Sequence, residues 1–160
     1  MTKDWFVQQI DGLQGRLYRI ALSILRNHAD VQDALQETVL KAWEKRNTLR
    51  NEAYFGTWVT RIAINTCRQM IRQNKKMIPM EELPETPASG EDITLKMLME
   101  CLPEKLRIPF IMQYSEGMDT KEVAECMHLT QSAVRSRIHR AKLILRKELA
   151  DHEKESMAAR

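Results

Sequence analysis

Six basic side chains lie close together in the stretch QSAVRSRIHRAKLILRK, residues 131–147, which contains no acidic residue. Val134, Ile138, Ala141 and Leu145 recur in it at the spacing of one helix face, so we expect a helix that buries this face. The remaining surface then carries hydroxyl groups and long cationic side chains. Arginine can donate two hydrogen bonds to guanine, and basic charge displaces the counterions of phosphates. The pattern therefore indicates contact with DNA rather than a solvated charged face.

A short helix and a turn precede this basic stretch. Asp119 is expected to cap a helix over residues 120–127, with Glu122 in the capping-box position. Residues 128–129 then form a tight turn, and Thr130 caps the basic helix. Two helices joined by such a short turn, with the second one basic, are typical of a helix-turn-helix whose second helix enters the major groove.

A second acid-free stretch, YFGTWVTRIAINTCRQMIRQNKK, covers residues 54–76 and contains five basic residues. Its helical spacing places one set of side chains towards a core: Phe55, Val59, Ile62, Ala63, Thr66 and Met70. Another face forms a cationic stripe with an indole at its start: Trp58, Arg61, Asn65, Arg68 and Arg72. Aromatic rings beside basic groups suit unstacked bases, each stacking contact contributing ~1–3 kcal/mol. Phe55 and Trp58 could instead be core residues, whereas the rest of the stripe favours nucleic acid. The polar loop RNTLRNEA before this helix, residues 46–53, could hold a flipped base.

The stretch DVQDALQETVLKAWEK, residues 30–45, predicts a helix with a different surface. Asp30 is expected to cap it. The expected inward face is Ala34, Leu35, Thr38, Val39 and Ala42. The opposite face, here called the acidic strip, is Asp33, Gln36, Glu37, Leu40 and Glu44. A single exposed leucine often has no functional role, because much of a protein surface is apolar. The strip nevertheless has the wrong charge for DNA and is therefore a candidate surface for a protein partner.

These elements belong to an all-α chain of two modules. Helical periodicity recurs along it, whereas alternating strand patterns and Asn-Gly hairpins do not occur. Residues 1–78 carry 13 basic and 7 acidic side chains, residues 79–92 carry none and 5, and residues 93–160 carry 12 and 10. The middle segment holds three of the five prolines and reads as a solvated linker. It could act as a nucleic-acid mimic or only as a tether.

The composition excludes several classes of protein. With 43% apolar and 29% charged residues, the chain is not disordered throughout. Neither a signal peptide nor a membrane-spanning run is present, so we expect no membrane insertion and a cytoplasmic location. The three cysteines, Cys67, Cys101 and Cys126, have no C-x-x-C spacing and are expected to be reduced and buried. No catalytic or metal-binding motif occurs, so we expect no enzyme, cofactor or metal.

The three stretches together resemble a bacterial sigma factor of the extracytoplasmic-function (ECF) group, in the sigma-70 family. DVQDALQETVLKAW resembles region 2.2, YFGTWVTRIAINTCRQMIR resembles regions 2.3 and 2.4, and the segment from LPEKLRIPF to RAKLILRKEL resembles region 4. The resemblance covers residues 16–76 and 93–149. It implies a region 2 helical domain over 1–78, a linker over 79–92 and a region 4 helix-turn-helix domain over 93–160.

The resemblance also implies roles and partners. The protein would bind core RNA polymerase and promoter DNA, initiate transcription in an envelope or stress response, and pair with an anti-sigma factor. Contacts to the clamp helices of the polymerase would come from Asp33, Gln36, Glu37 and Leu40. Opening and capture of the minus-10 element would involve Asn47, Arg50, Asn51, Trp58, Arg61, Asn65, Arg68 and Arg72. Duplex reading of the minus-35 element would involve Gln131, Ser132, Arg135, Ser136, His139, Arg140 and Lys142.

The chain departs from the family pattern at a few positions. His128 stands where glycine commonly makes the turn, and histidine tolerates the left-handed conformation better than most residues do. Ser132 and Ala133 replace a common Gly-Thr pair, and His139 replaces a frequent aromatic residue, so the minus-35 preference can differ. The alternative to a sigma factor is a dimeric helix-turn-helix regulator, which would leave the acidic strip and the stripe on residues 58–72 without a use.

Overall fold

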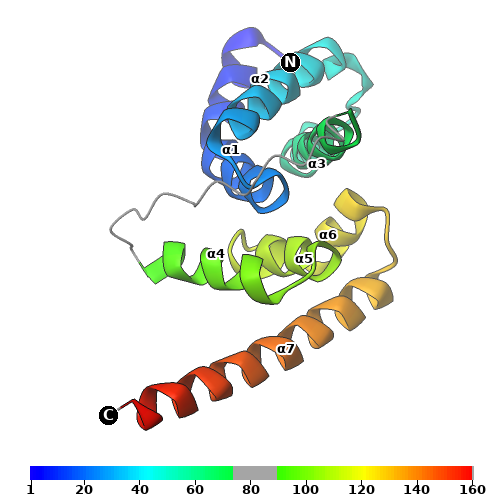
Figure 1. The fold of residues 1–160 in the computed structure, drawn as a ribbon. Helices are drawn as coiled ribbons and strands as arrows, with labels where there is room; N and C mark the ends of the chain where they lie inside the picture. Colours follow the sequence, from blue (N-terminus) through cyan, green and yellow to red (C-terminus); the bar gives the residue numbers. More distant parts are fainter. Residues whose placement is uncertain (74–89, 160) are drawn as a thin grey trace.

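The computed structural model of this chain describes residues 1–73 and 90–159, with the backbone alone for residues 90–95. Every regular element in these ranges is helical (Figure 1), which confirms the all-α expectation. The expected linker over residues 79–92 lies outside the described residues except for its last three positions, which belong to α4. The elements are α1 (Lys3–Leu25), α2 (His28–Glu44), the 3-10 turns η1 (Arg46–Thr48) and η2 (Glu52–Tyr54), α3 (Phe55–Gln73), α4 (Gly90–Cys101), α5 (Glu104–Tyr114), α6 (Thr120–Met127) and α7 (Gln131–Ala158).

The expected cap of the second helix is wrong by three residues. α2 begins at His28, and its N-cap is Asn27, whose side chain accepts a hydrogen bond of 2.9 Å from the backbone N–H of Asp30. The Asn27 amide in turn donates to the Asp30 carboxylate at 2.8 Å. Asparagine caps helices as well as aspartate does, so the helix starts at the first of the two. Asp30 instead lies in the first turn, where its negative charge interacts favourably with the positive end of the helix dipole.

The N-terminal module, α1 to α3, is organised around an aromatic cluster. The rings of Phe6 and Phe55 meet edge to face, with their centroids 5.6 Å apart. The ring of Trp43 packs on that of Phe6, with a centroid distance of 5.0 Å. Phe55 is only 2% exposed, so its expected core position is confirmed. Because these rings come from α1, α2 and α3, they set the orientation of the helices that carry the acidic strip and the cationic stripe.

The C-terminal module, α4 to α7, contains the expected helix-turn-helix. Asp119 caps α6 by accepting from the Glu122 N–H at 2.8 Å, and Thr130 caps α7 by accepting from the Ala133 N–H at 3.1 Å. His128 ends α6 in the left-handed conformation, with φ of 55°. The caps and the turn therefore lie where the sequence predicts them.

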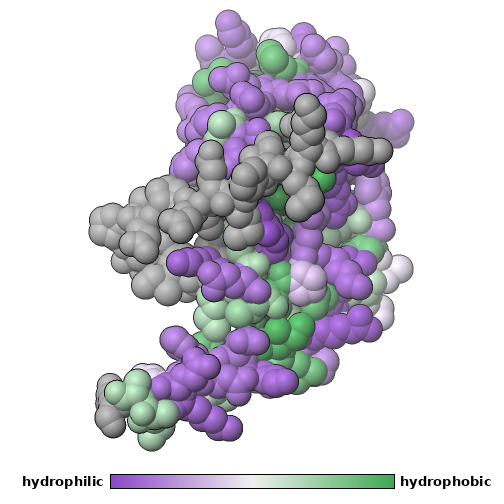
Figure 2. Space-filling model, in the orientation of Figure 1, coloured by the Kyte–Doolittle hydropathy of each residue, from purple (hydrophilic) through white to green (hydrophobic). Residues whose placement is uncertain are grey.

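The two modules pack against each other. One cluster of buried side chains includes Ile20 and Ile64 from the N-terminal module and Ile108, Met112 and Val123 from the C-terminal one. α5 contacts α1, and α6 contacts α3; Figure 1 shows α4 to α6 as a layer between the N-terminal helices and α7. Apolar residues appear at the surface between this layer and α7, whereas the N-terminal module shows a mostly hydrophilic face in the same view (Figure 2). Across the described ranges, no helix has the length and apolar character of a membrane span.

Candidate nucleic-acid and protein interfaces

The N-terminal half of α7 presents the face that the sequence predicts. Val134 and Ala141 are fully buried and Ile138 is 6% exposed. The predicted minus-35 residues lie on the open side, where these six are exposed: Gln131, Ser132, Arg135, Ser136, His139 and Arg140. The helix thus offers hydroxyl, imidazole and guanidinium groups to solvent from a rigidly packed base, an arrangement suited to base edges and phosphates.

Two other cations of α7 contact the protein itself. The Lys142 ammonium lies over the ring of Tyr114, 5.1 Å from its centroid, and Lys142 is half-buried. Arg137 donates to the carbonyl oxygen of Lys105 at 3.3 Å. Pro109 lies four residues after Lys105 inside α5 and has no N–H to donate to that carbonyl. Arg137 therefore satisfies an acceptor that the proline leaves open, and this contact connects α7 to α5.

The cationic stripe on α3 is partly open and partly in contact with the C-terminal module. Asn65 and Arg72 are exposed. Trp58 is half-buried, and its ring centroid lies 5.9 Å from that of Phe55, so the indole packs near the core and remains partly accessible. Arg61 and Arg68 also lie along this face, and both have partners on the other module.

The loop before α3 is ordered by its own side chains. The Arg46 guanidinium lies 4.0 Å from the centroid of the Trp43 ring and donates to the Trp43 carbonyl at 2.7 Å. The Asn51 side chain caps η2 by accepting from the Ala53 N–H at 3.0 Å. Asn47, Arg50 and Asn51 are exposed. The polar groups of the loop thus stand on a fixed backbone beside the start of α3.

The acidic strip lies on the open side of α2. Asp33, Gln36 and Glu37 are exposed, and Leu40 is 63% exposed. Glu37 pairs with Lys41 at 3.1 Å. Protein interfaces combine an apolar centre with a polar rim. A solvent-exposed leucine surrounded by acidic and amide side chains fits that composition better than it fits a DNA contact.

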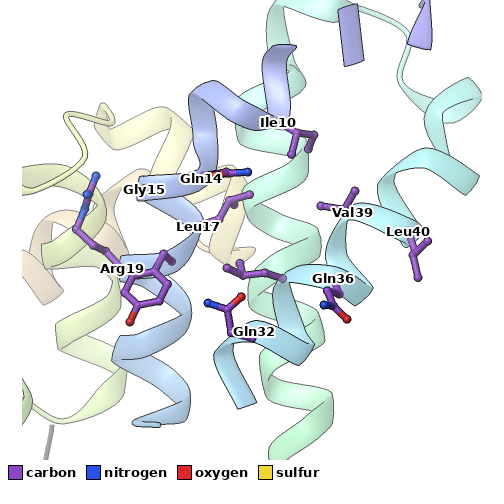
Figure 3. Close-up of a pocket in the computed structure, with 11 residues that line it drawn as sticks. Ile10, Gln14, Gly15, Leu17, Arg19, Gln32, Gln36, Val39 and Leu40 are labelled. Atoms are coloured by element: carbon purple, nitrogen blue, oxygen red, sulfur yellow. The ribbon is translucent and has the colours of Figure 1, made fainter. Parts of the chain in front are cut away.

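A groove of about 760 Å³ runs between α1 and α2, next to the acidic strip (Figure 3). Its apolar lining includes Ile10, Leu17 and Val39, and Gln36 and Leu40 of the strip belong to its edge. Sequence reasoning did not predict this groove, because its two walls come from different helices and only their packing brings them together.

Several contacts between the modules were also missed. Ile64 and Cys67 of α3 are fully buried although they lie outside the predicted inward face. Arg16 and Arg19 of α1 reach Glu116 of the C-terminal module. The burial of Cys67 was expected from its residue type, and the apolar character of Ile64, on a helix that already had one buried face, was the available signal for a second packing surface.

The three cysteines are free thiols. Cys67 and Cys126 are buried, whereas Cys101 is only half-buried, so the expectation of burial holds for two of the three. Burial raises the pKa of both the Cys67 and the Cys126 thiol to about 12. Such thiols stay protonated at neutral pH and react slowly.

Two family models match this chain in order. The model "Sigma-70 region 2" matches residues 10–77, and "Sigma-70, region 4" matches residues 93–145. The chain is 28% identical to the RNA polymerase sigma factor SigV of Bacillus subtilis, with 92% of this chain and 93% of SigV covered. It is 28% identical to the RNA polymerase sigma-E factor of Streptomyces coelicolor, with 96% and 90% covered. It is 24% identical to the ECF RNA polymerase sigma factor SigW of Bacillus subtilis, with 93% and 91% covered.

Solved structures share the fold. The sigma factor RpoE of Bartonella quintana, in complex with the anti-sigma factor NepR, aligns with a TM-score of 0.74 at 21% identity, covering 93% of this chain and 98% of RpoE. CnrH, in complex with the cytosolic domain of CnrY, aligns with a TM-score of 0.72 at 24% identity, covering 94% and 90%. With both family models matched in order and relatives aligned along nearly the whole length, the chain belongs to the sigma-70 family of RNA polymerase sigma factors, in its ECF group.

Proposed function

We propose that this protein binds core RNA polymerase and directs promoter-specific initiation by reading a minus-35 element as duplex and by opening and capturing a minus-10 element. The observation that carries this proposal is the presence of both family regions, in order, on one chain whose exposed surfaces differ in charge. An acidic strip on α2 and basic faces on α3 and α7 are what a protein needs in order to bind a protein and DNA at once.

The acidic strip is the proposed polymerase contact. Asp33, Gln36 and Glu37 offer carboxylate and amide groups to basic or polar partner residues, and Leu40 offers an apolar anchor. The groove beside the strip extends the apolar surface that a partner helix could cover. Interfaces of this kind combine a small apolar centre with a polar rim.

The stripe on α3 and the preceding loop are proposed to hold the opened minus-10 strand. The half-buried Trp58 provides an indole ring for stacking, Arg61 and Arg72 provide charge for phosphates, and Asn65 provides an amide for a base. Asn51 stands on the ordered loop where a base turned out of the stack could be received.

The exposed face of α7 is proposed to read the minus-35 element in the major groove. Arg135, Ser136 and His139 occupy the first turns of the helix, which approach base edges in helix-turn-helix proteins. Arg140 and Lys142 lie further along, where phosphate contacts fix the register.

The protein is proposed to act in the cytoplasm, as an initiation factor without catalytic activity of its own, in an envelope or stress response. An anti-sigma factor is a proposed partner, because the solved relative from Bartonella quintana is bound to the anti-sigma factor NepR. Such a partner would compete for the surfaces that polymerase and promoter need.

The test is transcription in a purified system. Core polymerase is incubated with genomic DNA in the presence or absence of this protein, and the 5′ ends of the transcripts are mapped. The proposal predicts defined start sites only when the protein is present, and co-elution of the protein with polymerase. A protein that binds duplex DNA but produces no start site would be a helix-turn-helix regulator, and the proposal would be wrong.

A further inference from the structure

The loop that is proposed to receive the captured base is anchored at one end by Arg46, which is not among the residues proposed to contact DNA. Arg46 is the first residue of η1, at the start of this loop. Its guanidinium lies 4.0 Å from the centroid of the Trp43 ring and donates to the Trp43 carbonyl at 2.7 Å. A planar guanidinium can stack on the indole and bond the carbonyl at once, whereas a lysine ammonium lacks that geometry. Arg46 thus fixes the start of the loop to the last turn of α2.

Trp43 is in turn held by the aromatic cluster. Its ring packs on that of Phe6, with centroids 5.0 Å apart, and the rings of Phe6 and Phe55 meet with centroids 5.6 Å apart. Phe55 is the first residue of α3. We call this series of contacts, from Arg46 through Trp43 and Phe6 to Phe55, the ring chain. It connects the start of the loop to the start of the helix that follows the loop.

The ring chain sets the separation between the two ends of the loop. Asn51 fixes the far end by capping η2 next to α3. The exposed residues Asn47, Arg50 and Asn51, which are proposed to contact the minus-10 strand, lie between Arg46 and α3. Trp58, which offers its indole to the same strand, packs near Phe55, which belongs to the ring chain. Both halves of the proposed minus-10 site therefore take their position from the same aromatic contacts.

Phe6 cannot act by touching DNA. It is 4% exposed, and it lies in α1 outside residues 10–77, which the region 2 model matches. Binding sites hold their contact groups within about 0.5 Å when the supporting side chains are locked by packing. Leucine at position 6 would keep an apolar side chain there and lose the edge-to-face ring contacts. Any change in base preference that this substitution causes must then pass through the positions of other residues.

We propose that Arg46 and Phe6 are positioning residues for minus-10 recognition, which act through the ring chain to hold the loop where it accepts one preferred base. This inference rests on the proposed function. It adds two residues that do not read DNA themselves and that set the selectivity of the residues that do. The order of the loop is measurable in the free protein, and base preference is measurable in transcription.

Loop order is measured by amide hydrogen exchange, followed by NMR in the free protein. The backbone N–H groups of Thr48 and Tyr54 donate to backbone carbonyls at 2.9 and 3.1 Å, so their exchange reports opening of η1 and η2. Phe6→Leu and Arg46→Lys should each speed exchange at these two amides at least fivefold and leave the amides of α7 unchanged. Parent-like exchange in both variants would overturn the proposal.

Base preference is measured by transcription with core polymerase from a promoter library randomised in the minus-10 block. Both variants should flatten the preference at the same single position at least fivefold, while the minus-35 preference and polymerase binding stay within twofold of the parent. Because both residues act through one series of contacts, the double variant should lose less than the product of the two single effects. An effect confined to Arg46→Lys would indicate a direct DNA contact and would overturn the positioning role.

Two controls match these substitutions. Ile24→Val changes another buried residue of α1, 4% exposed and outside the aromatic cluster, and should lower stability without altering base preference. Lys45→Gln removes an exposed charge beside Arg46 and should keep the loop exchange and the base preference of the parent. An equal loss of preference in Ile24→Val would show that lower stability alone explains the effect, and the proposal would be wrong.

The two experiments separate this proposal from the proposed function. The exchange assay contains neither polymerase nor DNA, so it decides whether the ring chain orders the loop even if the protein starts no transcripts. Absence of start sites with the parent would overturn the proposed function and the positioning role together. Defined start sites whose base preference is unchanged in both variants would support the proposed function and overturn the positioning role alone.

Discussion

Charge reversal on the acidic strip is expected to weaken binding to core polymerase strongly while changing the stability of the folded protein only slightly. In the variant Asp33→Lys with Glu37→Lys, both residues lie on the exposed face of α2, one helical turn apart. Removing one partner of a desolvated interfacial charge pair costs about 2–5 kcal/mol. Two reversals therefore cost at least about 4 kcal/mol of binding free energy, which is about a thousandfold in the dissociation constant for core polymerase.

The same two substitutions should lower the free energy of unfolding by much less than they lower the binding free energy. The Glu37 side chain is 52% exposed, and its pair with Lys41 spans 3.1 Å. An exposed pair at this spacing contributes about 0.3–0.5 kcal/mol, and lysine at position 37 adds repulsion of similar size. The total cost in unfolding free energy is about 1 kcal/mol, or about 2–4 °C in Tm for a chain of this length.

The assay is equilibrium binding to immobilised core polymerase, with a thermal melt on the same samples. The matched control is Asp151→Lys with Glu155→Lys, which has the same spacing and charge change on exposed turns of α7 beyond the region 4 match. The control should bind as the parent does. If the strip variant also binds within threefold of the parent, α2 is not the polymerase contact and the reasoning from its surface fails.

Three further predictions concern the C-terminal module. Asp119→Ala removes the 2.8 Å cap of α6 and should cost about 1 kcal/mol, lowering Tm by about 2–4 °C. Ile138→Ala, at a site 6% exposed, should cost about 2–5 kcal/mol in urea unfolding because it leaves a cavity. Burial raises the Cys126 pKa from 9.0 to about 12, so its contribution to stability is full below pH 9 and is lost as the pH rises towards 12. By pH 10.5 the free energy of unfolding falls by about 2 kcal/mol through this thiol, and Cys126→Ala should remove that part of the pH dependence.

Each of these three has its own control and its own contrary result. Asp119→Asn keeps a capping oxygen and should melt close to the parent; a melt as low as that of the alanine variant would argue against the cap. Ile138→Val should cost only about 0.5–1.5 kcal/mol, and equal costs for valine and alanine would contradict a well-packed site. For Cys126, the measurement is urea unfolding at pH 8 and 10.5, and an unchanged pH dependence in the alanine variant would contradict burial of the thiol.

The local features of this fold were predictable from the sequence. The apolar spacing of Val134, Ile138 and Ala141 identified the buried face of α7, because one helix turn repeats every 3.6 residues. Asp119 and Thr130 identified helix starts, because each side chain accepts a hydrogen bond within its own first turn. Such signals depend on residues a few positions apart, and the sequence shows these directly.

Features that depend on distant residues were not predictable. Nothing near Glu116 in the sequence indicates that Arg19, 97 positions earlier, will hold its carboxylate. Ile64 is fully buried in a cluster shared by both modules, and the helical pattern of α3 alone shows only one apolar face clearly. A local competition also misled the prediction for α2, since Asn27 and Asp30 are both good caps and the first one starts the helix.

The central claim is that two separate surfaces of one chain read two separate promoter elements on polymerase, and a randomised promoter library tests it most directly. Start sites are mapped with the parent, with Arg135→Ala and with Asn65→Ala. Arg135→Ala should relax base preference at one position near minus-35, by about 1–3 kcal/mol, and leave the minus-10 block unchanged. Asn65→Ala should do the reverse. Either variant altering both blocks, or weakening all promoters equally, would contradict the account.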